Sequence, residues 1–119
     1  MRSLLSAGDL LATIDSAEPS AEAGSQEGYA VAASDLFLVN GKPKADTNGL
    51  TDSGAVEIYD AVSRVHLYTL ESPGPTVGAL FGFSVSISGN TLVVGAHNSG
   101  AAGGGNVFVY NLSSTEAEL

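Results

Sequence analysis

The chain repeats itself, and this internal repeat restricts its fold more than any other feature. The segment GYAVAASDLFLVNG, which begins at Gly28, returns as GFSVSISGNTLVVGA, which begins at Gly82. Two further pairs of segments match, residues 54–60 with 105–111 and residues 10–19 with 66–75. The matching segments lie 51 to 56 residues apart, so the chain holds two copies of one unit. Repeats of this length are typical of units that cannot bury their apolar surface alone and therefore stack on neighbours.

Within each copy apolar and polar residues alternate, which indicates β-strands. Phe83, Val85 and Ile87 fall on one face of their segment, and three serines fall on the other. The Ser88-Gly89-Asn90 sequence predicts a tight turn into the next strand. No segment repeats apolar residues at helical spacing over three turns. We therefore predict eight short strands, four in each copy, at residues 10–14, 29–33, 36–39, 55–59, 65–70, 83–88, 91–96 and 106–110.

The last strand of the second copy carries large side chains on both faces, so its sheet should be covered on both sides. Val107 and Val109 face one way, and Phe108 and Tyr110 face the other. A propeller blade is enclosed in this way by its neighbours, whereas each strand of a two-sheet sandwich exposes a polar face. We predict an all-β fold of two four-stranded antiparallel blades in a β-propeller-like array, with the sandwich as the alternative.

The repeat also divides the chain into segments. We predict an N-terminal lead-in at residues 1–9, a first repeat at residues 10–60 and a second repeat at residues 61–112. Residues 113–119 form a polar, acidic tail that we expect to fray.

The composition excludes several classes of partner and site. The formal net charge is −9, with only four Lys and Arg residues, and this charge repels phosphate. We therefore expect neither nucleic acid nor an anionic membrane surface as a partner. No apolar run approaches the ~18 residues that a membrane span requires. The chain has no Cys, which excludes disulfides, thiolate metal sites and cysteine nucleophiles.

The second copy resembles the FG-GAP repeat. Phe81-Gly82 is followed by SVSI, then by LVV with Gly95-Ala96-His97 in place of GAP, and then by a Gly-rich loop and GNVFVYN. The first copy departs from the pattern, with Glu27-Gly28 in place of FG and Asn40-Gly41-Lys42 in place of GAP. That family builds seven-bladed propellers in integrin α-subunits and in many bacterial surface or secreted proteins. The resemblance implies binding or scaffolding, and an extracellular or cell-surface location.

Many members of that family also hold calcium in an Asp-rich loop just before the LVVGAP strand. In this chain the corresponding position contains only Ser34-Asp35 in one copy and Ser88-Gly89-Asn90 in the other. Neither sequence offers the several oxygen ligands that Ca²⁺ requires. We therefore expect this family site to be absent.

A different loop is the best candidate for a metal site. Asp46, Asn48 and Asp52 place oxygen side chains around a glycine, which resembles half of a calcium loop. The loop lacks the further anionic ligands of a complete site, and Asx residues with glycine are also typical of a plain hairpin loop. A Ca²⁺ site with these three residues as ligands and an ordinary loop are the two interpretations. We expect no other cofactor.

No catalytic pattern is present. His66 and His97 are the only histidines, neither lies in a nucleophile motif, and the sequence contains no G-x-S-x-G. We expect that the chain is not an enzyme.

The number of copies leads to a functional hypothesis. A closed propeller needs about four to eight blades, and an open pair exposes an apolar sheet face at each end. We predict a non-catalytic structural subunit whose blades assemble with copies of itself or with a larger partner protein. That the chain is a fragment of a longer propeller is another explanation for its having only two blades. The competing hypothesis is an extracellular adhesion or ligand-binding module for glycan or protein, with a weak Ca²⁺ site.

Overall fold

The computed structural model describes residues 8–14, 26, 28–46, 49–74, 77–98, 104–114 and 116–119. Within these residues the chain forms strands and turns and no helix, which confirms the all-β prediction. The strands are β1 (Ala30–Ala33), β2 (Phe37–Lys42), β3 (Ala55–Asp60), β4 (His66–Glu71), β5 (Phe81–Ser88), β6 (Thr91–Ala96), β7 (Asn106–Leu112) and β8 (Ala117–Glu118).

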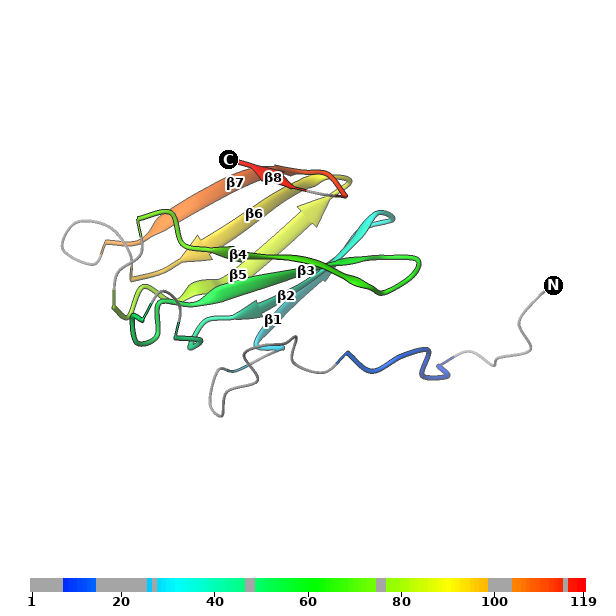
Figure 1. The fold of residues 1–119 in the computed structure, drawn as a ribbon, viewed down its shortest axis with the longest axis horizontal. Helices are drawn as coiled ribbons and strands as arrows, with labels where there is room; N and C mark the ends of the chain where they lie inside the picture. Colours follow the sequence, from blue (N-terminus) through cyan, green and yellow to red (C-terminus); the bar gives the residue numbers. More distant parts are fainter. Residues whose placement is uncertain are drawn as a thin grey trace.

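The strands form two four-stranded sheets, as predicted (Figure 1). The first sheet has the order β1-β2-β3-β4 and the second has the order β5-β6-β7-β8. Every pair of neighbouring strands is antiparallel. Each sheet is therefore a simple meander, in which every strand pairs with the strand that follows it in the chain.

Three details of the predicted strand assignment are wrong. Residues 10–14 form no strand. The strand predicted at residues 65–70 to open the second sheet overlaps β4, which lies at the edge of the first sheet. The predicted fraying tail instead contributes β8, which pairs with the end of β7. A tight turn joins β3 directly to β4, with Asp60 N donating to Val65 O at 2.9 Å, and such local pairing is the usual outcome for consecutive strands. The sheets are thus shifted by one strand along the sequence repeats at 10–60 and 61–112.

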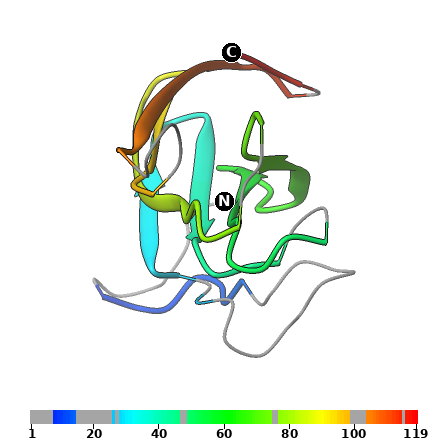
Figure 2. The ribbon, with the colours of Figure 1, turned by 90° about the vertical axis from the view of Figure 1, so that its left-hand side faces the viewer.

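The hydrophobic core lies between the two sheets. One face of the first sheet contributes Phe37, Val39, Val56 and Ile58. The facing side of the second sheet contributes residues from β5, β6 and β7, among them Phe81, Leu92, Val94, Phe108 and Tyr110. Figure 2 shows the second sheet, yellow to red, curving over one side of the first sheet, cyan to green.

The two sheets come closest along β5. The amide of Phe81 donates to the Ser53 carbonyl at 3.0 Å, and Phe81 forms an isolated parallel bridge with Gly54. Strand β5 contacts β1, β2 and β3 of the first sheet. At the outer edge a side chain makes the connection, because the Tyr68 hydroxyl donates to the carbonyls of Ser113 and Glu116 at 2.8 and 2.9 Å. The first strand of the second sheet thus lies against the first sheet, and two sheets in contact in this way are arranged like successive blades of a radial array.

Candidate interaction surface

The sheets stack in the same orientation, so the covered face of the first sheet has a counterpart on the outer face of the second. In the first sheet Val39 pairs with Ile58, and both side chains face the second sheet. The equivalent pair in the second sheet is Val93 and Val109. Their neighbours along the strands, such as Val94 and Phe108, face the core. Since side chains alternate along a strand, Val93 and Val109 face away from the first sheet.

The two equivalent faces differ in their exposure. Val56 and Ile58 are 0 % exposed, whereas their counterparts Val107 and Val109 are 68 % and 53 % exposed. We call the outer face of the second sheet the open face; it comprises Ser84, Ser86, Val93, Gly95, Val107 and Val109. Its valines are flanked by serines, so the open face is only partly apolar. It is the face on which a third sheet would pack if the stacking step continued.

The opposite end of the stack, the outer face of the first sheet, is polar at its centre. Glu57 is 2 % exposed, and its Oε2 atom accepts a hydrogen bond from Lys42 Nζ at 3.2 Å. Its Oε1 atom lies 2.7 Å from His66 Nε2 and also accepts a hydrogen bond from the Thr69 hydroxyl. Beside this cluster the Asn40 side-chain oxygen accepts a hydrogen bond from the Gly28 amide at 2.6 Å. A buried carboxylate is therefore held by partners on β2 and β4.

This cluster was missed by the sequence analysis. The only signal in the sequence is a Glu in the middle of the apolar segment AVEIYD. Glutamate is almost never fully buried unless it is paired, so its position within a strand predicts a partner. The partner itself follows only from the register, because Lys42 and His66 lie on different neighbouring strands.

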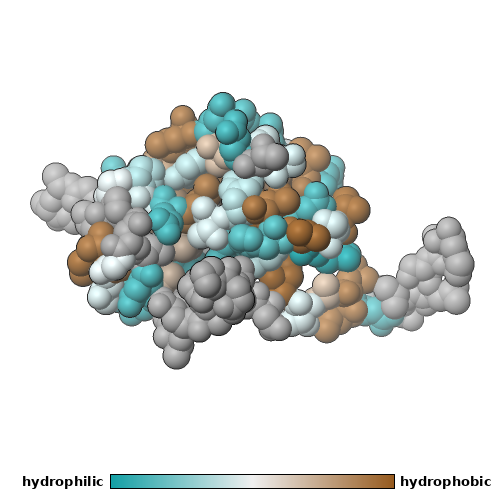
Figure 3. Space-filling view, viewed as in Figure 1, coloured by the Kyte–Doolittle hydropathy of each residue, from teal (hydrophilic) through white to brown (hydrophobic). Residues whose placement is uncertain are grey.

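The same outer face holds an apolar cavity of about 480 Å³. Ile14 from the described N-terminal stretch lines it, together with Val31, Leu38 and Tyr59 of the first sheet. Residues 8–14, blue in Figure 1, are largely apolar on the surface view in Figure 3. Leu10 and Leu11 in this stretch are 79 % and 63 % exposed.

Two of the three predicted metal ligands fall within the described residues. Asp46 Oδ1 accepts a hydrogen bond from the Asp52 amide at 2.9 Å, so the two residues lie together across the loop. Asn48 lies outside the described residues. The described part of the chain contains no group of three or more His, Asp or Glu side chains able to hold a metal ion. The Ca²⁺ site at Asp46, Asn48 and Asp52 stays a prediction.

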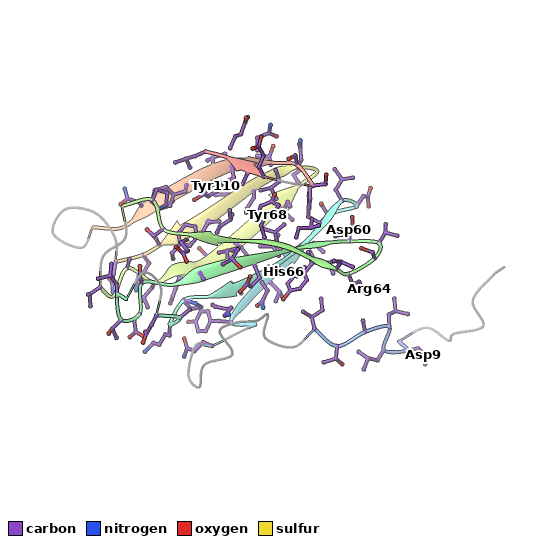
Figure 4. The ribbon with its side chains drawn as sticks, viewed as in Figure 1. Asp9, Asp60, Arg64, His66, Tyr68 and Tyr110 are labelled. Carbon is purple, nitrogen blue, oxygen red and sulfur yellow. The ribbon has the colours of Figure 1, made fainter. Side chains whose placement is uncertain are left out.

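The two histidines belong to different sheets and have different surroundings. His66 on β4 contacts Glu57, as described above, and is one-third exposed (Figure 4). His97 follows β6 and stacks on Phe83, with ring centroids 4.5 Å apart. The ring of Phe83 in turn contacts the ring of Tyr29, with centroids 5.1 Å apart. Each histidine thus has a packing or hydrogen-bonding role within its own sheet.

Burial and hydrogen bonding shift the pKa of three groups labelled in Figure 4. Burial raises the pKa of Tyr110 to about 12, and it also raises the pKa of Tyr68. Hydrogen bonds from the backbone amides of Ser63 and Val62 lower the pKa of Asp60. Asp60 lies at the turn from β3 to β4, which is away from the open face. These shifts therefore follow from burial and from the hydrogen bonds of the turn after β3.

Comparison with known proteins identifies the second copy. Residues 70–110 match the family model of the FG-GAP repeat, which confirms the resemblance for this segment. FG-GAP repeats are generally protein-interaction modules and are typical of extracellular or cell-surface proteins. No curated protein matches the chain. No helix in the described part of the chain is both long and apolar enough to span a membrane.

Proposed function

We propose that the chain is a non-catalytic protein-interaction subunit that extends a stack of β-blades through the open face of its second sheet. The carrying observation is that Val107 and Val109 occupy the positions of the buried Val56 and Ile58 and yet are exposed. The FG-GAP match over residues 70–110 supports an interaction role. An extracellular or cell-surface location is part of the proposal, because such repeats are typical of proteins found there.

The composition of the first sheet favours a larger partner over a head-to-tail stack of identical chains. In the second sheet the face that covers the first carries Val94, Ala96 and Phe108. The equivalent face of the first sheet carries Asn40, Lys42 and Glu57. A second copy stacked in the same way would bring this polar face onto the open face of the first copy. These three side chains are already buried, and their partners lie within the first sheet or at Gly28, so this face offers little apolar surface to cover Val107 and Val109. A blade with an apolar covering face fits the open face better.

An added blade tests the proposal directly. The chain is extended after Leu119 by a further copy of residues 78–119, and Val109→Cys supplies the only thiol, since the chain has no Cys. If the open face accepts a blade, the thiol of the extended chain reacts with a labelling reagent much more slowly than the thiol of the parent chain. A Val62→Cys control, at an 81 % exposed turn position, should react at the same rate in both chains. Equal rates for Val109→Cys in the two chains would overturn the proposal.

Self-assembly is tested separately by light scattering. A mass that is a multiple of the 11.9 kDa chain, and that falls to the monomer with Val109→Lys, would favour copies as the partner. A monomer at all concentrations would remove this second candidate and leave the larger partner.

The ligand-binding alternative is supported by the 480 Å³ cavity on the first sheet. Calorimetry with Ca²⁺ tests its cation-dependent form, with Asp52→Ala as the comparison. Absence of calcium heat in the parent chain would contradict that form. Asp46→Ala is less informative, because Asp46 also accepts the Asp52 amide and so has a structural role in the loop.

A further inference from the structure

The start of β5 enters a socket that two glycines create in the first sheet. A β-carbon on Gly54 would overlap with the backbone of Phe81, and one on Gly41 would overlap with the carbonyl oxygen of Gly82. Gly54 also has a φ of +93°, which a residue with a side chain rarely adopts. The Ser53 carbonyl accepts the Phe81 amide at 3.0 Å. The first sheet therefore binds the Phe-Gly pair through its backbone.

The ring of Phe81 is enclosed between the two sheets. It is 0 % exposed and contacts Phe108 and Tyr110, with ring centroids 5.8 and 6.4 Å away. The adjoining wall on the first sheet includes Val56, whose side chain would lie 3.0 Å from a β-carbon on Gly82. An aromatic ring followed by glycine thus satisfies both requirements of the socket, an apolar side chain and a close backbone approach.

The second sheet has glycines at the equivalent positions, where the nearest atoms to an added β-carbon belong to Ser84 and His97 of the second sheet itself. Gly95 pairs with Val107 as Gly41 pairs with Val56. Gly105 stands immediately before β7 as Gly54 stands before β3, and its φ of +87° repeats the φ of Gly54. Gly95, Gly105 and Val107 line a recess of about 390 Å³, together with Ser84 and His97. We call this recess the second socket.

We propose that the second socket binds a β-strand of a partner protein that begins with an aromatic residue followed by glycine. This inference rests on the proposed function and adds the element of the partner that is recognised. Gly104, which precedes Gly105 as Ser53 precedes Gly54, is placed to accept the amide of the incoming aromatic residue. Val107 and Val109 form the wall against which its ring packs.

The sequence argues against a second copy of residues 1–119 as the donor of this strand. Its single Phe-Gly pair, Phe81-Gly82, is already enclosed between the two sheets. The first copy has Glu27 at the position of the phenylalanine. A carboxylate against Val107 and Val109 would lose its hydration without gaining a partner. A second copy of the chain therefore lacks a free strand of the required sequence.

A peptide tests the inference on the intact chain. The probe is ALFGFSVSISG, the sequence of residues 79–89, and a control peptide carries Ala in place of its first Phe. In a titration followed by amide NMR we expect shifts at Gly95, Gly105 and Asn106. Binding should weaken about tenfold or more with the control peptide, because the buried ring is lost.

Variants of the chain locate the binding site. Val107→Lys places a charge in the wall of the second socket and should abolish the shifts, whereas Val62→Lys, at an exposed turn on the first sheet, should leave them unchanged. Absence of shifts at millimolar peptide, or equal binding by Val107→Lys, would overturn the inference. The two proposals fail separately: protection of Val109→Cys in the extended chain without peptide binding removes the socket and retains the interaction function. Binding of the peptide without that protection retains the second socket as a strand-binding site and removes the stacking of a whole blade on the open face.

Discussion

The carbonyl oxygen of Gly82 lies so close to Gly41 that a side chain on Gly41 would have no space. Gly41 belongs to β2 of the first sheet and Gly82 to β5 of the second, so the two sheets meet here backbone to backbone. This contact brings Phe81 between the sheets, where it joins the core. The glycines of the repeat thus set the distance between the two blades.

The first prediction compares equivalent glycines in the two sheets. Gly41→Ala should lower the free energy of unfolding by about 2–3 kcal/mol, because the backbone of β5 must move away. Gly95→Ala should cost about 1 kcal/mol or less. The atom that a β-carbon on Gly95 would meet first is the hydroxyl oxygen of Ser84, which can rotate to a new position. Urea denaturation of both variants measures the difference, and equal losses would contradict the role assigned to Gly41.

Much of the fold could be predicted because its signals are local. Strict alternation in residues 83–88 and the following Gly-Asn turn specify β5 and β6 without reference to the rest of the chain. The sheet to which β4 belongs could not be predicted in the same way. The similarity of residues 66–75 to residues 10–19 suggested a strand that opens each repeat, but the short turn after Asp60 pairs β4 with β3. A sequence repeat therefore identifies the duplicated unit. Which strands pair into one sheet is decided by the turns that connect them.

The candidate surface was only partly predictable. The side-chain alternation at Val107, Phe108, Val109 and Tyr110 predicted a sheet covered on both sides, yet it could not show which side the chain covers itself. That depends on the packing of β5 against the first sheet. The contacts of Glu57 depend on strand register, since Lys42 and His66 are distant from it in sequence. Both features depend on contacts between different strands, and the alternation of apolar and polar residues along one strand does not encode them.

The second prediction concerns the buried ion pair of Lys42 and Glu57. Lys42→Met removes the cation and leaves a carboxylate that is only 2 % exposed, so we expect a loss of about 3–5 kcal/mol. The double variant Lys42→Met with Glu57→Gln should be more stable than the sum of the two single losses predicts, by about 1 kcal/mol or more. Urea denaturation of all four proteins gives this coupling. Additive losses would show that the two side chains do not stabilise one another.

The third prediction follows from Tyr110 at alkaline pH. Its pKa is raised by burial from 10.0 to about 12, so the folded chain keeps the phenolic proton over a range in which the unfolded chain releases it. The stabilisation is complete below pH 10 and is lost as the pH rises toward 12, by roughly 2–3 kcal/mol in all. Tyr110→Phe should make the decline of stability over this range shallower. Tyr68 acts in the same direction, so some decline should remain. An unchanged slope for Tyr110→Phe would contradict the assignment.

The last prediction concerns Asp60 at acidic pH. The Asp60 carboxylate accepts hydrogen bonds from the amides of Val62 and Ser63, each at 2.8 Å, and these bonds hold its pKa below the usual 3.8. The carboxylate therefore stabilises the folded chain above that ordinary value, and this stabilisation is lost as the pH falls through the lowered pKa of the folded state. Asp60→Ala should lower the Tm at pH 7 by loosening the turn between β3 and β4. The Tm difference from the parent chain should shrink below pH 4, since protonation weakens the same hydrogen bonds in the parent.

Asp35→Ala, at the exposed turn between β1 and β2, serves as the control and should change the Tm less at pH 7. A Tm difference for Asp60→Ala that stays constant from pH 7 to pH 2 would show that the charge on Asp60 has no part in holding the turn.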